Sequence, residues 1–306
     1  MHDHSAVASA CRRTLPSPAQ AGHYGCRVLA VALLFASNAA LSAQLSAPNA
    51  AGVAMGHLHY RVKDVEAQKR FWMALGGRPI VWGESGSGIR LPGVTLLFTT
   101  GESTGGSDGS VVNHVAFRVP SFAGVEAAGL SVQRLQQFPG VGSVMTPDGE
   151  RIELFEDAAT NLAFTPDSGP LDALAQRHSR PVPPPIAFHH IHLNVPAGAV
   201  AEAKAWYARV FGGTPGKRST YDAVDLPGVN VNISAAPRPV SGTAGRALDR
   251  IGFEVEDLRS FEERVKAMNV TLTDSPVTRE RLGYQSRTLV DPWGTVIELT
   301  QGLRRY

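Results

Sequence analysis

Hydrophobic and polar residues alternate along the chain in four similar blocks, and each block predicts a strand, a helix and three further strands. The first block opens with the alternating run 56–62, and after Asp64 apolar side chains recur at helical spacing. Gly76 and Gly77 end this helix, as glycine commonly does. Short apolar runs then predict strands around 79–82, 88–91 and 94–99. The block is therefore predicted to be a βαβββ unit.

The same pattern returns three times, so the chain is predicted to be a tandem repeat of four units. The further units open with the strands 112–119, 188–195 and 249–255. The second and the fourth unit each end in a Pro-containing turn followed by an apolar strand that carries one carboxylate, Glu153 or Glu298. A carboxylate within an apolar strand is costly unless it has a partner. One unit alone has too little core to be stable, so such units are expected to pack against one another. Repetition on this scale is therefore strong evidence that the βαβββ assignment is right.

The first 43 residues have the order of an export segment. Basic residues precede the apolar run 28–36, which is too short to span a bilayer, and small residues follow it. We expect a signal peptide over 1–43, cleaved between Ala39 and Ala43, and a secreted or periplasmic protein that has no membrane attachment after cleavage. A disordered alanine-rich leader is the alternative.

Composition narrows the class of protein. The chain has 306 residues, enough for two domains, and its apolar fraction of 43% is sufficient for true cores. A net charge of only +2 argues against a nucleic-acid surface. Both cysteines, Cys11 and Cys26, precede the folded part. No disulfide or thiol chemistry is therefore expected in the mature domains.

Paired βαβββ units, a histidine in the opening strand and a Pro-Asp-Gly or Pro-Trp-Gly turn before Ile-Glu-Leu together resemble the vicinal oxygen chelate superfamily. That group includes glyoxalase I, extradiol dioxygenases, fosfomycin-resistance enzymes and bleomycin-binding proteins. The resemblance implies an α+β fold in which consecutive units pair into two domains with cupped mixed sheets. These domains would span 56–157 and 188–302, with a flexible lead-in over 44–55 and a proline-rich linker over 158–187.

The resemblance also implies a metal site in the first of these domains. Ligands in the superfamily come from the opening strand, five residues before a valine, and from the last strand. These positions hold His57, His114 and Glu153. A fourth position falls on Leu96, which cannot ligate. Two histidines and one carboxylate favour Fe(II) or Mn as the divalent metal, and Ni or Zn are also compatible.

Other residues share the faces of these two strands, because alternate side chains point to the same side. His59 is the candidate catalytic acid or base. Arg61 and Arg118 are candidates to bind an anionic group of the substrate, or equally to pair with a carboxylate of the cup. Asn113 is expected either to orient a ligand or to cap the strand.

The second domain departs from the pattern. His190 and Glu298 hold matching positions, but Arg250 stands where the second histidine is expected, and the fourth position falls on Val231. Arginine cannot become a ligand. We therefore expect a degenerate second site without a metal, in which Arg250 pairs with Glu298.

The resulting hypothesis is an exported, divalent-metal-dependent, dioxygenase-like enzyme whose small substrate chelates the metal through adjacent oxygens. A glyoxalase-type lyase or isomerase is the first alternative, weakened by Leu96 because members of that kind generally use a second carboxylate. A non-catalytic small-molecule-binding protein is the second alternative. The sequence leaves open whether the paired units pack within one chain or exchange with a second copy in a homodimer.

Overall fold

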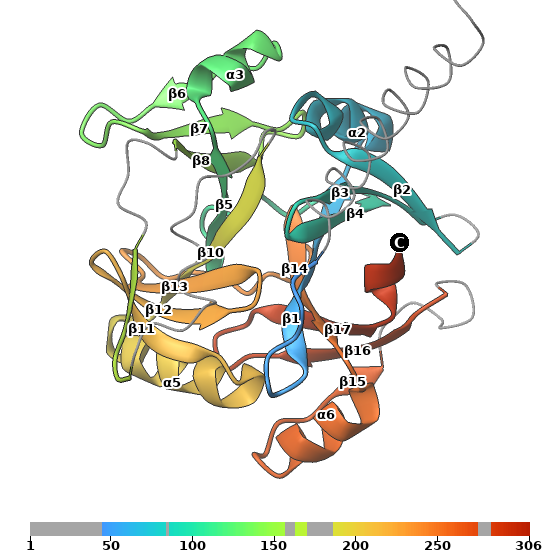
Figure 1. The fold of residues 1–306 in the computed structure, drawn as a ribbon, viewed down its shortest axis with the longest axis vertical. Helices are drawn as coiled ribbons and strands as arrows, with labels where there is room; N and C mark the ends of the chain where they lie inside the picture. Colours follow the sequence, from blue (N-terminus) through green and yellow to red (C-terminus); the bar gives the residue numbers. More distant parts are fainter. Residues whose placement is uncertain (1–44, 84–85, 157–162, 170–185, 275–282) are drawn as a thin grey trace, which may run out of the picture. The chain divides into compact units, whose positions relative to one another are not determined.

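The computed structural model describes residues 45–83, 86–156, 163–169, 186–274 and 283–306 (Figure 1). These residues belong to one compact unit, Ala43–Tyr306. The predicted signal peptide lies outside the described residues. Within the described ranges, no helix combines the length and the apolar character that crossing a membrane would require.

All four predicted βαβββ units are present, and the α+β fold class is confirmed. The first consists of β1 (Val53–Val62), α2 (Val65–Ala74), β2 (Arg78–Trp82), β3 (Gly86–Leu91) and β4 (Val94–Thr100). The second consists of β5 (Val112–Val119), α3 (Phe122–Ala127), β6 (Gln133–Arg134), β7 (Val141–Met145) and β8 (Arg151–Glu156). The third consists of β10 (Ala187–Val195), α5 (Val200–Phe211), β11 (Thr214–Arg218), β12 (Tyr221–Leu226) and β13 (Val229–Ala235). The fourth consists of β14 (Leu248–Val255), α6 (Leu258–Lys266), β15 (Thr273–Asp274), β16 (Gln285–Val290) and β17 (Val296–Gln301). Two single turns, η1 (Ala197–Ala199) and η2 (Leu303–Arg305), complete the helical part.

Local signals account for the ends of the helices. Asp64 caps α2, since its Oδ1 accepts a hydrogen bond from the backbone N of Ala67 at 3.0 Å. α5 ends at Gly212, whose φ of 67° lies in the left-handed region that favours glycine. These boundaries follow from residues close in the chain, which is why the sequence pattern predicts them.

The units do not pair as expected. One sheet has the strand order β15-β16-β17-β14-β1-β4-β3-β2, so it joins the first unit to the fourth; we call it the first–fourth sheet. The other has the order β6-β7-β8-β5-β10-β13-β12-β11-β9 and joins the second unit to the third; we call it the second–third sheet. At the two seams β1 runs antiparallel to β14, and β5 runs antiparallel to β10 (Figure 1). The predicted domains 56–157 and 188–302 are therefore wrong as structural units, because each sheet draws strands from both halves of the chain.

Two stretches that were expected to connect or precede domains are built into the fold. β9 (Phe164–Pro166) lies in the predicted linker and pairs with β11, with Phe164 opposite Arg218. In the predicted lead-in, Asn49 Nδ2 donates hydrogen bonds to the backbone oxygens of Phe211 and Gly212, both at 3.0 Å. The rest of the predicted linker lies largely outside the described residues.

A single hydrophobic cluster joins the two sheets. Trp72 of α2, from the first unit, lies 5.3 Å between ring centroids from Phe117 of β5. Phe211 of α5, from the third unit, lies 4.5 Å from Phe253 of β14. Helices of each pair thus contact strands of the other sheet. Because side chains alternate along a strand, His114 and Arg118 lie on the face of β5 opposite to Phe117.

Gly252→Ala tests the pairing of β1 with β14. Gly252 lies opposite His57, and a Cβ at this position would overlap the His57 ring. We expect the substitution to lower the free energy of unfolding by about 1–3 kcal/mol through overpacking. The loss should shrink in a His57→Ala background, where the ring is gone. Gly198→Ala is the control, because nothing lies within 4 Å of its added Cβ. Denaturant unfolding measures all of these, and an undiminished loss in the His57→Ala background would contradict the pairing.

Candidate metal centre

Each sheet carries a buried group of side chains with the composition of a metal site. On the second–third sheet His114, His190 and His192 offer ligand atoms within 4.8 Å of one another. On the first–fourth sheet His57, His59 and Glu298 do the same. The two groups differ in what stands beside them.

On the second–third sheet, Glu153 joins two of the histidines in a nearly equilateral triangle of ligand atoms. Glu153 Oε1 lies 3.3 Å from His114 Nε2 and 3.6 Å from His190 Nε2, and the two Nε2 atoms are 3.3 Å apart. Atoms bound to one zinc-like ion at roughly 2.0–2.2 Å are roughly 3.0–3.5 Å apart. The three side chains therefore suit simultaneous ligation as they stand. We call this triangle the second–third centre.

Strand register explains the convergence of these three side chains. Glu153 in β8 lies opposite Ala116 in β5, and Ala116 lies opposite His190 in β10. Because the side chain of Ala116 is small, the side chains of Glu153 and His190 on either side of it can approach each other. His114 shares the face of Ala116, being two residues away. All of these residues thus contribute to one point on one face of the sheet.

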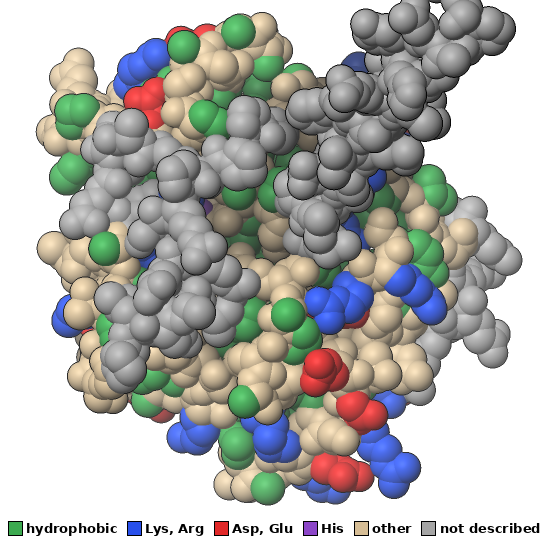
Figure 2. Space-filling model, in the orientation of Figure 1, with side chains coloured by type: hydrophobic (Ala, Val, Ile, Leu, Met, Phe, Trp, Pro, Cys, Tyr) green, Lys and Arg blue, Asp and Glu red, His purple; other side chains and the backbone are tan. Residues whose placement is uncertain are grey.

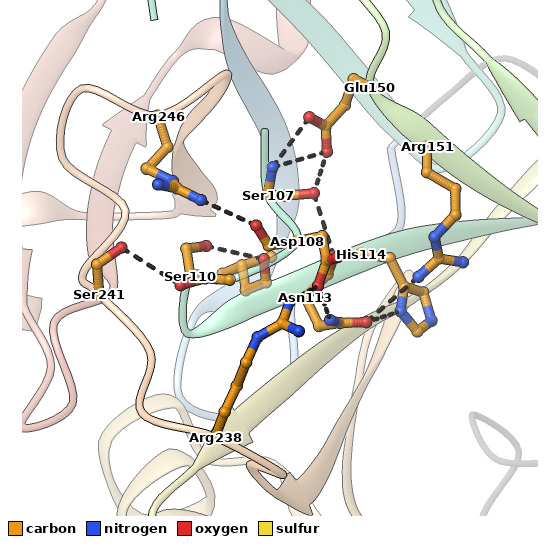
Figure 3. Close-up of polar contacts among 12 residues, drawn as sticks. Ser107, Asp108, Ser110, Asn113, His114, Glu150, Arg151, Arg238, Ser241 and Arg246 are labelled. Atoms are coloured by element: carbon orange, nitrogen blue, oxygen red, sulfur yellow. Dashed lines mark hydrogen bonds and ion pairs between the residues drawn. The ribbon is translucent and has the colours of Figure 1, made fainter. Parts of the chain in front are cut away.

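Hydrogen bonds outside the triangle fix the tautomer of His114 (Figure 3). Arg151 Nη2 donates to Asn113 Oδ1 at 3.3 Å, and the same oxygen lies 2.7 Å from His114 Nδ1. An amide oxygen only accepts, so His114 Nδ1 carries the proton and Nε2 presents its lone pair to the triangle. Asn113 Nδ2 in turn donates to Asp108 Oδ1 at 3.3 Å. The position of Asn113 is therefore that of a residue that orients His114.

Burial keeps His190 and its neighbour His192 neutral. Burial, followed by the charges of His189 and His114, lowers the pKa of His190 well below its ordinary value. Burial also lowers the pKa of His192 to about 3. Neutral imidazole is the form that binds metals. Two imidazole nitrogens and a carboxylate oxygen at such short separations need a cation or a proton among them, so the donor set fits a divalent metal.

His192 stands beside the triangle without belonging to it. Its ring centroid lies 4.9 Å from that of His114, and its Nε2 lies 2.6 Å from Ser234 Oγ. The sequence offers a signal for this placement, since His192 follows His190 by two residues in a strand and shares its face.

On the first–fourth sheet the group is centred on Glu298, which is 1% exposed. Its Oε2 lies 3.2 Å from His57 Nε2 and 3.5 Å from His59 Nδ1, and Ser286 Oγ donates to its Oε1 at 2.5 Å. Burial by itself would raise the pKa of Glu298, but the hydrogen bonds and charges of His57 and His59 outweigh burial and hold it well below the ordinary value. The carboxylate is therefore ionised across the physiological range. We call this group the first–fourth centre.

Arg250 distinguishes the first–fourth centre from its counterpart. It lies opposite His59 in the register, as His114 lies opposite His192 in the other sheet. Its Nη1 is 3.6 Å from Glu298 Oε2, and its Nε and Nη2 donate to Asp249 Oδ2 at 3.1 and 2.8 Å. A guanidinium cannot ligate a metal. Here it supplies a permanent positive charge beside the carboxylate.

The structure does not bring together the predicted ligands His57, His114 and Glu153. His114 and Glu153 do meet, but His57 lies in the other sheet beside Glu298. His190 takes the place that was predicted for His57. The reason is the pairing of the units: consecutive units were expected to pair, whereas the first pairs with the fourth and the second with the third.

The predicted degenerate site is divided in the same way. Arg250 and Glu298 do lie together, but His190 is in the other sheet. Of the candidates for chemistry, His59 contacts Glu298 and, through Nε2 at 2.7 Å, Thr99 Oγ1. Arg61 is partly exposed, 3.9 Å from Asp249. Arg118 alone lies on the face of the second–third centre, and it is buried.

The fourth ligand position was predicted at Leu96 and Val231, and neither of them lies beside a histidine in the strand register. Leu96 and Val231 both lie in the hydrophobic cluster, on the face of their strands that points away from the two centres. The register instead places Asn230 opposite His190. Little histidine surface is visible on the face shown in Figure 2, in keeping with the burial of both centres.

Comparison with known proteins gives one family and a set of similar folds. Residues 187–299 match the model of the Glyoxalase/Bleomycin resistance protein/Dioxygenase superfamily. No curated protein sequence matches the chain. Glyoxalase I from Zea mays is 14% identical, with 83% of this chain and 94% of that chain covered and a TM-score of 0.54. A proposed dioxygenase from Bacillus subtilis is 13% identical, with 85% and 86% covered and a TM-score of 0.53. At these identities the likeness concerns the fold alone.

Proposed function

We propose that this chain, whose residues 187–299 belong to the glyoxalase/bleomycin resistance protein/dioxygenase superfamily, is a divalent-metal-dependent enzyme with its metal at the second–third centre. The ligands are His114, His190 and Glu153. The observation that carries the proposal is their triangle, with sides of 3.3, 3.3 and 3.6 Å between ligand atoms. The proposed reaction is dioxygenase-like, on a small molecule that offers two adjacent oxygens.

The ligand set supports this class of reaction. Two imidazoles and one carboxylate on one side of a metal leave positions open for a substrate, an arrangement typical of Fe(II) oxygenases and also compatible with Mn. A bound metal would supply Lewis acidity to the adjacent oxygens of the substrate and, as Fe(II), redox capacity toward oxygen. Asn113 and Arg151 hold His114 in the ligating tautomer. His192 is the neutral imidazole next to the triangle and can hydrogen-bond to a substrate hydroxyl.

Asn230 weighs against a glyoxalase-type lyase or isomerase. It lies opposite His190, in the strand from which the resemblance implies a second carboxylate for enzymes of that kind, and an amide cannot replace that carboxylate. Three converging donor atoms weigh against a binding protein without a metal. Export to the periplasm or the medium is part of the proposal and rests on the pattern around residues 28–36 alone.

Binding of 4-nitrocatechol to the metal-loaded protein tests the proposal. The protein is stripped of metal, reloaded anaerobically with Fe(II) or Mn(II), and titrated while the absorbance of the probe is followed. We expect a complex with one probe per chain that forms only when the metal is present. Oxygen uptake with a series of catechols then reports turnover of the Fe(II) form. A protein that takes up no metal, or whose metal does not change probe binding, would overturn the proposal.

A further inference from the structure

A buried arginine on the second–third sheet has no hydrogen-bond partner for its two terminal nitrogens among the described residues. Arg218, the last residue of β11, is 3% exposed. Its Nε donates to Asn230 Oδ1 at 3.1 Å. Among the described residues, no hydrogen-bond acceptor reaches its Nη1 or Nη2. Buried polar groups almost always have partners, so two orphaned donors on one cation call for an explanation.

Arg218 lies on the same face of the sheet as the second–third centre. Asn230, which accepts its hydrogen bond, is opposite His190 in the register. Neighbouring strands are about 4.8 Å apart. Only Asn230 therefore lies between the guanidinium of Arg218 and the proposed metal ligand His190. One small molecule could contact both the guanidinium and the metal. Asn232 lies opposite His192, and its Oδ1 is also buried without a partner among the described residues.

The charge of Arg218 persists despite its burial. Burial lowers the pKa of Arg218 to about 10, with Asp225 opposing this shift and Arg118 adding to it. The guanidinium is therefore still a cation at neutral pH. The positive charge of Arg218 therefore favours binding of a negatively charged group at this face of the sheet.

Arg90, a buried arginine of the first–fourth sheet, provides a contrast. It too is 3% exposed, but its Nη2 donates to the backbone oxygen of Leu303 at 3.4 Å. Arg90 ties its sheet to the C-terminal turn η2. The terminal nitrogens of Arg218 have no such role within the described fold.

We propose that Arg218 binds a carboxylate of the substrate, so that the substrate is a small carboxylic acid that also carries two adjacent oxygens. The free Nη1–Nη2 edge is a planar fork that matches the two oxygens of a carboxylate. Phe164, whose ring centroid is 5.8 Å from the guanidinium carbon, flanks the group and restricts its orientation. The two adjacent oxygens of this substrate follow from the proposed function. The carboxylate follows from Arg218 alone.

Matched probes on the metal-loaded protein test the assignment. Catechol and 3,4-dihydroxybenzoate differ only in a carboxylate, and each competes against 4-nitrocatechol. We expect wild-type protein to bind the acid about 10- to 100-fold more tightly, the range that charge-assisted hydrogen bonds supply. In Arg218→Met the two affinities should become nearly equal, with catechol unchanged. Arg90→Met should keep the wild-type ratio. Arg218→Lys keeps the positive charge but not the planar fork, so its ratio of the two affinities should be intermediate. This variant replaces Arg218→Met in the test if the methionine variant does not fold.

A second arm uses metal-free protein, so that the acid site is tested apart from the metal. Benzoate should raise the melting temperature of wild-type and Arg90→Met protein but not that of Arg218→Met. If inorganic phosphate stabilises wild type and benzoate does not, the carboxylate assignment is overturned in favour of a phosphoryl group. An acid preference that survives in Arg218→Met overturns the role of Arg218. If benzoate acts through Arg218 but no catechol binds the metal-loaded protein, the acid site stands and the proposed function fails.

Discussion

His190→Ala should abolish stoichiometric metal binding, whereas His57→Ala should leave one divalent metal per chain. Both histidines stand five residues before a valine in an opening strand, so the sequence treats them alike. The structure places His190 Nε2 within 3.6 Å of both Glu153 and His114, and places His57 beside Glu298 and near Arg250. Loss of a partner that only orients a ligand costs about 10- to 100-fold in metal affinity, so loss of a ligand itself should cost more than about 100-fold.

Elemental analysis after gel filtration measures the stoichiometry, and competition with a chelator measures the affinity. His57→Ala is the matched control, because it removes the equivalent imidazole from the other sheet. The opposite result, with metal lost from His57→Ala and kept by His190→Ala, would assign the metal to the first–fourth centre. Two metals bound per wild-type chain would show that Arg250 does not exclude a metal there.

Glu298→Gln should destabilise the protein more than any surface substitution, by about 3–5 kcal/mol. The side chain of Glu298 is 2% exposed, and Arg250 Nη1 lies 3.6 Å from it. Removing the negative charge leaves the guanidinium with Asp249 as its counterion. It also replaces one of the two oxygens that His57 and Ser286 contact with an NH2 group, which cannot accept a hydrogen bond. Denaturant unfolding measures the loss. Glu126→Gln, which removes the exposed partner of Arg134, is the control and should leave the midpoint unchanged.

The acid dependence of stability gives this prediction a second readout. The folded state holds the pKa of Glu298 well below the ordinary value of a glutamate. A carboxylate with a depressed pKa stabilises the fold fully above its unfolded pKa, about 4.3, and this contribution is lost as the pH falls below that value. The difference between wild type and Glu298→Gln should therefore be constant near neutral pH and shrink below about pH 4.3. A difference that grows on acidification would mean that Glu298 is not the ionised partner of this centre.

Local sequence determined the four units and the kinds of residue at each centre. The helix that starts at Asp64 and the one that ends at Gly212 are set by caps within a few residues, and the strands follow from alternation. The same alternation placed His114 and Arg118 on one face of β5. Arg250 distinguished one centre from the other by residue type alone, because an arginine cannot ligate a metal. These are short-range properties, so the chain itself carries them.

Tertiary structure alone decided which units share a sheet, and therefore which histidine meets which carboxylate. Each opening strand has an edge that can pair antiparallel with the opening strand of another unit, and backbone hydrogen bonds do not distinguish the partners. The choice depends on packing between distant residues, such as Trp72 against Phe117 and Phe211 against Phe253. That no described residue accepts a hydrogen bond from Arg218 Nη1 or Nη2 follows only from the placement of β11 and β13 in one sheet. A donor's lack of partners depends on its whole surroundings and not on its position in the chain.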